Sequence, residues 1–243
     1  MSFVTLGLIM TTIETNLQTV RDRLSAACQG AGRAPGSVTL LAVSKTFGPD
    51  AVAAAYACGQ TAFGENYIQE AVQKITQLRH LPLQWHCIGP IQSNKTRLVA
   101  EYFDWVHTVD RLKVAQRLSE QRPAGLAPLQ LCIQVNVDGG DTKSGVRPED
   151  ALALAQQVAA LPNVRLRGVM SIPEPAIDFV AACALLTRVR VVFDALNAQG
   201  LALDTLSMGM SADLEAAVHA GSTMVRVGTA IFGGRSYVPV AAT

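Results

Sequence analysis

Lys45 is the residue whose type and position in this sequence point most clearly to chemistry. It ends the apolar run 38–44, which predicts a buried β-strand with Lys45 at its carboxyl end. Partial burial disfavours the ammonium form of a lysine and leaves a nucleophilic amine that can form a Schiff base with a carbonyl compound. A solvated strand end is the alternative, and the lysine alone does not identify the carbonyl.

A second set of candidates surrounds a glycine turn near the C-terminus. Ser207, Gly209 and Ser211 lie where a predicted strand leads into a helix, with Ser211 as the expected N-cap. Small side chains and exposed backbone amides at a helix N-terminus bind anions. The sequence therefore predicts an anion site here, although helix capping alone would also explain these residues.

Gly228 and Thr229 follow the last predicted strand and again combine close backbone approach with a hydroxyl donor. Barrels of alternating strands and helices frequently bind phosphate with the loops after strands seven and eight. In a closed barrel the first strand neighbours the eighth, so Lys45 should meet this anion site. A ligand held there should carry both an aldehyde and a phosphate, as pyridoxal 5′-phosphate (PLP) and small phosphosugars do.

Arg226 lies in that last predicted strand and is a further candidate. A fixed cation that faces a pyridine nitrogen keeps this nitrogen unprotonated and weakens the ring as an electron sink. The protein would then hold such a cofactor rather than use it for demanding chemistry. A salt bridge to a neighbouring acid is the alternative.

Short β-rich runs alternate with amphipathic helical patterns along most of the chain, which requires parallel strands. Eight runs are predicted as strands: 38–44, 61–64, 84–88, 105–108, 129–137, 164–170, 204–207 and 223–227. Eight strand and helix units predict an α/β fold, a single (β/α)₈ TIM barrel, with an open doubly wound sheet as the alternative. An extra N-terminal helix is predicted over 12–29. Residues 1–10 are expected to be an unstructured leader, 11–237 the barrel and 238–243 a tail.

The composition of the chain argues against binding to nucleic acid, to an anionic membrane or to a metal ion. The chain has 243 residues and a formal net charge of +1, so it lacks the cation excess that binding to nucleic acid or anionic membrane requires. Its five cysteines contain no C-x-x-C pair, which predicts reduced thiols in a cytoplasmic protein. His80, His107 and His219 lack the spacing of metal ligands, so no metal is expected.

Six motifs, in the same order along the chain, resemble the pyridoxal phosphate homeostasis proteins, also called the YggS or PROSC family. They occupy 42–45, 63–70, 85–95, 143–145, 206–215 and 225–233. The resemblance implies a single barrel like the N-terminal domain of alanine racemase. It also implies a protein without robust catalysis that binds PLP and contributes to intracellular PLP (vitamin B6) and amino-acid homeostasis, with PLP-dependent apoenzymes as possible recipients.

The resemblance also implies a role for each candidate residue. Lys45 would hold PLP as an internal aldimine, and Arg226 would face the pyridine side. The remaining positions have these implied roles: Ser207, Gly228 and Thr229 hold the phosphate, Ser211 and Gly209 lie close by, Asn66 lies near the ring or its hydroxyl, and His86 forms part of the wall.

Two enzymes remain as alternatives: a PLP-dependent racemase of the alanine racemase type, and a class I aldolase that uses Lys45 on a phosphosugar. In alanine racemase, a second acid/base group comes from an additional domain, and only 11 residues follow Phe232 in this sequence. We therefore expect no efficient racemisation, and an exposed barrel rim suits a monomer. Lys143 is expected to be a solvated loop cation, with transient receipt of PLP as an alternative.

Overall fold

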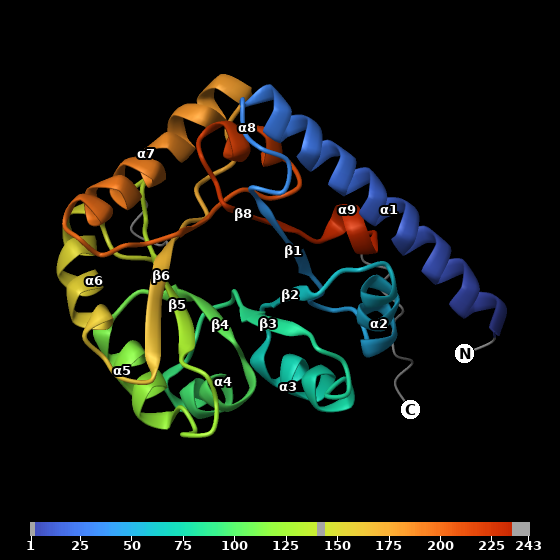
Figure 1. Ribbon diagram of the computed structural model, residues 1–243, viewed down its shortest axis with the longest axis horizontal. Coiled ribbons are helices and arrows are strands. Elements are labelled where there is room, and N and C mark those ends of the chain that lie inside the picture. Colours follow the sequence, from blue (N-terminus) through green and yellow to red (C-terminus); the bar gives the residue numbers. More distant parts are fainter. Residues whose placement is uncertain (1–2, 140–143, 235–243) are drawn as a thin grey trace, which may run out of the picture.

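Eight apolar segments form parallel strands that pair in chain order, and the last pairs with the first, so the sheet closes into a barrel (Figure 1). The computed structural model describes residues 3–139 and 144–234. The strands are β1 (Thr39–Val43), β2 (Ala62–Glu65), β3 (Gln84–Cys87), β4 (Trp105–Val109), β5 (Leu129–Gln134), β6 (Val164–Met170), β7 (Thr205–Ser207) and β8 (Met224–Val227). All eight predicted strands are confirmed, and the closed order excludes an open sheet.

A helical segment follows each strand and lies outside the barrel (Figure 1). The α-helices are α2 (Pro49–Ala57), α3 (Ile68–Gln77), α4 (Thr96–Tyr102), α5 (Leu112–Gln121), α6 (Ala151–Ala159), α7 (Phe179–Ala198), α8 (Leu214–His219) and α9 (Thr229–Phe232), with short 3₁₀ turns at η1 (Ser93–Lys95) and η2 (Pro148–Asp150). Because each helix returns the chain to the start of the next strand, the carboxyl ends of all strands share one rim.

The N-terminal helix α1 (Phe3–Gly30) begins nine residues before the predicted start at Thr12. The expectation that residues 1–10 form an unstructured leader is therefore wrong for residues 3–10, and Thr11 and Thr12 do not cap the helix. No proline interrupts this stretch, and adding a turn to a formed helix is far easier than nucleating one. Residues 1–2, Lys143 and the predicted tail lie outside the described residues.

Helix α1 fills the place in the outer layer beside β8, where the following helix α9 has only four residues. It packs against α2, α8 and α9 (Figure 1). Its buried stripe consists of Ile13, Leu17, Val20, Leu24 and Cys28, which recur at steps of three and four residues. No helix among the described residues is both long and apolar enough to cross a membrane.

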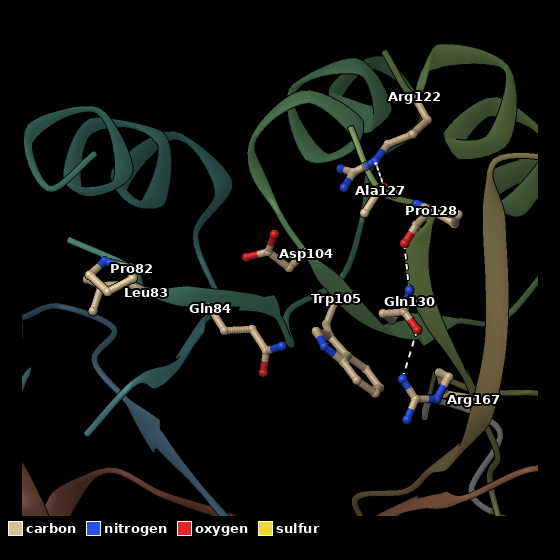
Figure 2. A pocket seen from close by; sticks show the side chains of 10 residues that line it. All are labelled: Pro82, Leu83, Gln84, Asp104, Trp105, Arg122, Ala127, Pro128, Gln130 and Arg167. Atoms are coloured by element: carbon tan, nitrogen blue, oxygen red, sulfur yellow. Dashed lines mark hydrogen bonds between the residues drawn. The ribbon is translucent and has the colours of Figure 1, made fainter. Parts of the chain in front are cut away.

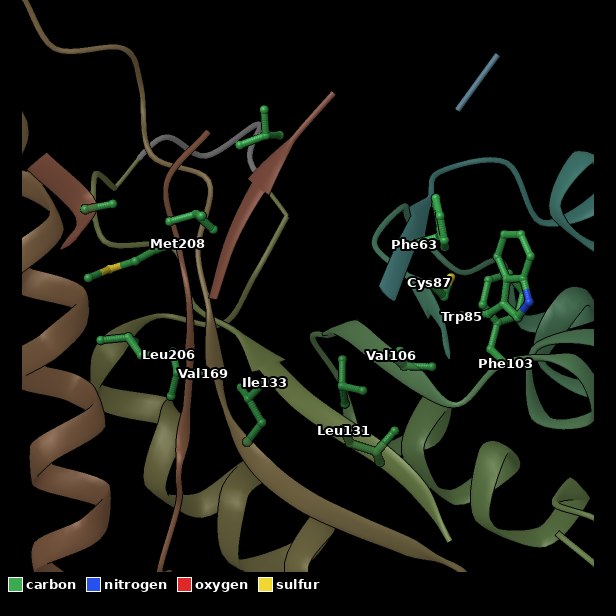
Figure 3. Close-up of a cluster of buried hydrophobic side chains, with 14 of the residues drawn as sticks. Phe63, Trp85, Cys87, Phe103, Val106, Leu131, Ile133, Val169, Leu206 and Met208 are labelled. Carbon is green, nitrogen blue, oxygen red and sulfur yellow. The ribbon is translucent and has the colours of Figure 1, made fainter. Parts of the chain in front are cut away.

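Strand residues alternate between the helix layer and the barrel interior, and the two sides differ in polarity. The side facing the helices is almost entirely apolar. Figure 3 shows part of it, where Phe63, Trp85 and Phe103 lie together, with the rings of Phe63 and Trp85 5.8 Å apart. This contact between strands and helices holds the two layers together, since burial of apolar area is the main stabilising term.

The barrel interior holds several polar side chains among its apolar ones. His86 and His107 are fully buried, and the Nδ1 atom of His86 lies 2.9 Å from Nε2 of His107. Burial lowers the pKa of His86 to about 3 and that of His107 well below its ordinary value of 6.5, where the nearby charge of Arg226 adds to the effect. Both rings are therefore neutral at pH 7.

These histidines predict a loss of stability on mild acidification. Below pH 6.5 the unfolded chain binds protons at both histidines while the folded chain binds none until far lower pH, so the free energy of unfolding falls as pH falls. Each histidine contributes a slope of about 1.4 kcal/mol per pH unit. Denaturant titrations between pH 7.5 and 5 should show a shallower slope for His86→Phe than for the unmodified protein. The control Gln77→Ala, at an exposed residue that does not titrate, should keep the original slope, and an unchanged slope in His86→Phe would contradict this account.

Candidate functional site

A cavity of about 490 Å³ opens at the carboxyl rim of the barrel and collects most of the predicted site residues. It contains six of the nine: Lys45, Asn66, Ser211, Arg226, Gly228 and Thr229. Residues from the ends of β1, β2 and β8 and from the loop after β7 thus meet, as closure of the barrel requires. The other three, His86, Ser207 and Gly209, are not among its lining residues.

Lys45 lies two residues after the end of β1 and enters the cavity partly buried. Its amine has no hydrogen bond or ion pair with any residue that the structure describes. The next residue, Thr46, has a φ of 69°, a left-handed conformation that is uncommon for a β-branched side chain. The backbone therefore turns sharply just after the lysine, and neighbouring groups must hold that turn.

A buried charged cluster holds the backbone on both sides of Lys45. The Lys74 amine, on α3, donates to the Ser44 carbonyl oxygen at 2.7 Å and to Glu65 Oε1 at 2.8 Å. The Ser44 hydroxyl donates to the same Glu65 oxygen at 2.6 Å. Glu70, which also pairs with Lys74, accepts from the Thr46 backbone amide at 2.7 Å. Lys45 is thus fixed between two anchored residues.

Two side chains of this cluster that can carry charge are buried. Glu65 is fully buried, and Lys74 is only 4 % exposed. Burial raises the pKa of the Glu65 carboxyl, and the Lys74 ammonium and the Ser44 hydroxyl oppose that rise. The second carboxyl oxygen, Oε2, has no hydrogen-bond partner among the described residues. Ionisation of Glu65 therefore depends on Lys74.

Arg226 places a buried cation at the floor of the cavity. It is 4 % exposed, and its Nη1 donates to the Ser207 carbonyl and hydroxyl oxygens at 2.8 and 2.9 Å, while Nη2 donates to the Ser171 carbonyl at 2.9 Å. Burial lowers its pKa to about 10, so it stays charged at pH 7. No carboxylate among the described residues forms an ion pair with it. The predicted alternative of a salt bridge is therefore wrong for the described part of the chain.

Asn66 follows β2 and contributes an unused acceptor to the cavity. Its Oδ1 is buried without a hydrogen-bond partner among the described residues. The Asn66 backbone is held by Gly89, because a Cβ at position 89 would lie 2.2 Å from the Asn66 carbonyl oxygen. An unpaired buried acceptor is costly unless a ligand donor meets it.

The predicted anion end of the site contains Ser211, Gly228 and Thr229. Ser211 does not cap a helix as predicted: α8 begins at Leu214 with Asp213 as its N-cap. The Asp213 carboxylate accepts from the Met210 amide at 2.6 Å, which bends the loop and leaves the Ser211 side chain on the cavity wall. Thr229 opens α9, where the first amides of a helix have no acceptor within the helix.

Helix α1 fixes both segments of this anion end. Arg23 donates to the Ser211 carbonyl oxygen at 2.7 Å and forms a two-pronged ion pair with Glu215 of α8. Asn16 donates to the Ile231 carbonyl oxygen of α9 at 2.9 Å. The extra N-terminal helix thus belongs to the support of the site.

The three predicted residues that do not line the cavity support it instead. The Ser207 hydroxyl bonds to Arg226 and to His107, and His86 lies behind His107. Gly209 has a φ of 91°, and a Cβ there would lie 2.3 Å from the Ala217 side chain, so only glycine fits between the loop and α8.

A second cavity of about 560 Å³ lies at the amino end of the barrel (Figure 2). Its two arginines are already engaged. Arg122 donates to the carbonyl oxygens of Ala100, Phe103 and Ala127, and Arg167 pairs with Asp204 and donates to Gln130. No lysine lines this cavity in the described part of the chain, so the carboxyl-rim cavity, which contains Lys45, is the candidate site.

The rim cavity can therefore bind a molecule with three features. A carbonyl group would meet the Lys45 amine, an electron-rich or anionic atom would meet Arg226, and an anionic tail would meet Ser211 and Thr229. Sequence reasoning missed Glu65, Lys74 and His107. The spacing of Glu70 and Lys74 was visible, but it is equally typical of a solvated helix face.

Comparison with known proteins is consistent with this geometry. Residues 13–236 match the family model described as "Alanine racemase, N-terminal domain". A pyridoxal phosphate homeostasis protein from Pseudomonas aeruginosa is 59 % identical over 228 residues, covering 94 % of this chain and 98 % of the relative. The structure of PipY from Synechococcus elongatus with PLP bound has a TM-score of 0.78 and 38 % identity, covering 91 % of this chain and all of PipY.

Alanine racemase from Corynebacterium glutamicum has a TM-score of 0.68 and 19 % identity, and covers 96 % of this chain and 63 % of the racemase. Identity this low shows a common fold and no more. The predicted barrel of the alanine racemase type is confirmed.

The charged cluster beside Lys45 yields a stability prediction. Lys74→Met would leave the buried Glu65 carboxylate without its ion-pair partner, which should lower the free energy of unfolding by about 3–5 kcal/mol in urea titrations. The double variant Glu65→Gln, Lys74→Met should recover part of that loss because the uncompensated charge is gone. Lys113→Met on exposed α5 surface is the control, and equal stability of Lys74→Met and this control would refute the role of the cluster.

Proposed function

Because this chain belongs to the pyridoxal phosphate homeostasis family, with the alanine racemase N-terminal fold, we propose that it binds PLP covalently on Lys45 and contributes to PLP balance. One observation carries the assignment. The unpaired Lys45 amine shares one cavity with the buried Arg226 cation and with Ser211 and Thr229. The family name and the PLP-bound PipY structure support the choice of PLP over a phosphosugar.

The residues of the cavity fit PLP in chemistry and in size. A volume of about 490 Å³ lies within the range of cofactor sites, which runs from roughly 300 to 1,000 Å³. The orphaned Asn66 Oδ1 supplies an acceptor for the ring hydroxyl of the cofactor. Thr229 and Ser211 supply hydroxyl donors for its phosphate, and Gly228 lets the backbone approach closely.

Bound PLP supplies an aldehyde that links to amines and a ring that withdraws electrons when its nitrogen is protonated. Lys45, whose side chain lines the cavity, would hold the cofactor covalently through this aldehyde. Arg226 would face the ring nitrogen and, as a buried cation, would disfavour its protonation. Arg226 would thereby weaken the ring as an electron sink.

We propose that the protein holds PLP without robust catalysis. Two-base racemisation needs an acid/base group on each face of the cofactor. Of the cavity-lining residues that the structure describes, Lys45 is the sole strong base, since the others are apolar, hydroxyl, amide or guanidinium side chains. A homeostatic role fits this arrangement, with apoenzymes as proposed recipients of the cofactor.

Lys45→Ala tests the assignment. The unmodified protein mixed with PLP should show the visible absorption of a Schiff base, and borohydride should fix a pyridoxyl group on Lys45, identified by peptide mass spectrometry. Lys45→Ala should lose both signals and keep its thermal unfolding transition, whereas the exposed-site control Lys113→Ala should retain them. Attachment to another lysine in the unmodified protein would overturn the site.

A second experiment separates holding PLP from catalysis. The loaded protein incubated with alanine in deuterium oxide should exchange the Cα proton no faster than free PLP does, because the described residues that line the cavity include no second strong base. Proton NMR of the alanine signals measures the exchange. Sustained turnover far above free PLP would favour the racemase alternative.

A further inference from the structure

A row of hydrogen-bonded side chains crosses the barrel interior from the amino end to the rim cavity. Oε1 of Gln84 lies 3.0 Å from Nε2 of His86, and Nδ1 of His86 lies 2.9 Å from Nε2 of His107. Nδ1 of His107 lies 2.9 Å from Oγ of Ser207, which accepts from Nη1 of Arg226 at 2.9 Å. The row joins β3, β4, β7 and β8.

The four inner members of this row are buried, and its outer end is accessible. Ser207, His86 and His107 are completely buried. Gln84 is exposed and lines the amino-end cavity beside Trp105 (Figure 2). Trp105 stacks on His86 with ring centroids 5.2 Å apart and an angle of 10° between the planes, which holds the imidazole in place.

The chemistry of the two ends gives the row a direction. Arg226 can only donate, so the Ser207 oxygen accepts from it and its single proton remains for His107 Nδ1. With both rings neutral, His107 then carries its proton on Nε2 and donates to His86 Nδ1. His86 likewise carries its proton on Nε2 and donates to the Gln84 carbonyl oxygen. This assignment uses each donor and acceptor along the row once.

We propose that the row is a positioning chain for the proposed PLP site, in which the Gln84 acceptor and the Arg226 donor at its two ends together set the direction of the hydrogen bonds, and His107, through Ser207, orients Arg226 toward the cofactor. The inference rests on the proposed function for its consequence and on contacts within this chain for its geometry. No net proton moves along the row. The two rings share one tautomer, with the proton either on Nε2 in both or on Nδ1 in both, and this choice sets the direction in which the hydrogen bonds run.

The position of Arg226 is what the row controls. Two of the three hydrogen bonds of its guanidinium end on Ser207, one on the carbonyl oxygen and one on the hydroxyl oxygen. If His107 donated to Ser207 instead, that hydroxyl would accept twice and its own proton would need a new acceptor in a buried place. Arg226 would then face competition for its acceptor.

The first test needs no substitution and no cofactor. Nitrogen-15 NMR of the PLP-free protein at pH 7 should show His86 and His107 as neutral rings protonated at Nε2. A ring protonated at Nδ1, or a charged ring, would overturn the direction that the geometry gives.

The second test reverses the direction from the far end of the barrel. Gln84→Lys replaces the terminal acceptor with a group that only donates, so both rings should switch to Nδ1 protonation. Gln84→Glu offers only acceptors and should preserve Nε2 protonation. Because Gln84 is exposed, both variants should fold. Unchanged ring tautomers in Gln84→Lys would overturn the proposal that Gln84 sets the direction.

The consequence for the cofactor is measured by titration with PLP. Gln84→Lys should weaken PLP binding about threefold to tenfold, the effect of disturbing one hydrogen bond. His80→Lys, which adds the same charge on an exposed loop, should bind normally. Switched tautomers with unchanged binding would refute the link to Arg226. If the unmodified protein bound no PLP at all, the proposed function would fail while the NMR result still decided the direction of the chain.

Discussion

A buried guanidinium cation that has no carboxylate partner among the described residues is the constraint around which the barrel interior is organised. Arg226 keeps its charge at neutral pH, so each of its donors needs an acceptor that the interior must supply. Two of the three acceptors are backbone carbonyls at the ends of β6 and β7. The third is a serine hydroxyl whose remaining hydrogen-bond capacity is taken by a histidine from the opposite side of the barrel. The Arg226 charge thus accounts for the polar side chains of Ser207 and His107 in the barrel interior.

The end of the cavity that contains Lys45 is held by ion pairs instead of by neutral acceptors. Beside Lys45, the Lys74 ammonium lies between the carboxylates of Glu65 and Glu70. These charges hold the backbone of Ser44 and Thr46, the residues on either side of Lys45. Lys45, which faces the cavity, has no partner in the described part of the chain, whereas Lys74 behind it is fully engaged. The Lys74 amine makes the backbone rigid, and the Lys45 amine is available for reaction.

Local sequence signals predicted the eight strands and five of the six cavity residues because each signal lies within a few residues of its consequence, whereas Asn66 was predicted from the family resemblance alone. An apolar run ending in Lys45 is such a signal, and so is Gly228 followed by Thr229. The supporting residues depend on contacts between distant segments: His107 meets Ser207 across 100 residues, and Lys74 reaches Ser44 across 30. Helix ends were also mispredicted where two signals competed, as when Asp213 rather than Ser211 became the N-cap of α8.

The attachment of α1 to the anion end has a consequence for how the protein forms. Arg23 binds Ser211 across 188 residues, and Asn16 binds Ile231 across 215. Contacts that close loops of this length form late, since the chain must first lose the entropy of bringing its ends together. During synthesis the part of the first helix that packs against α8 and α9 stays uncovered until these segments have emerged, and α2 covers only its own share. Completion of the anion end is therefore coupled to the emergence of α8 and α9.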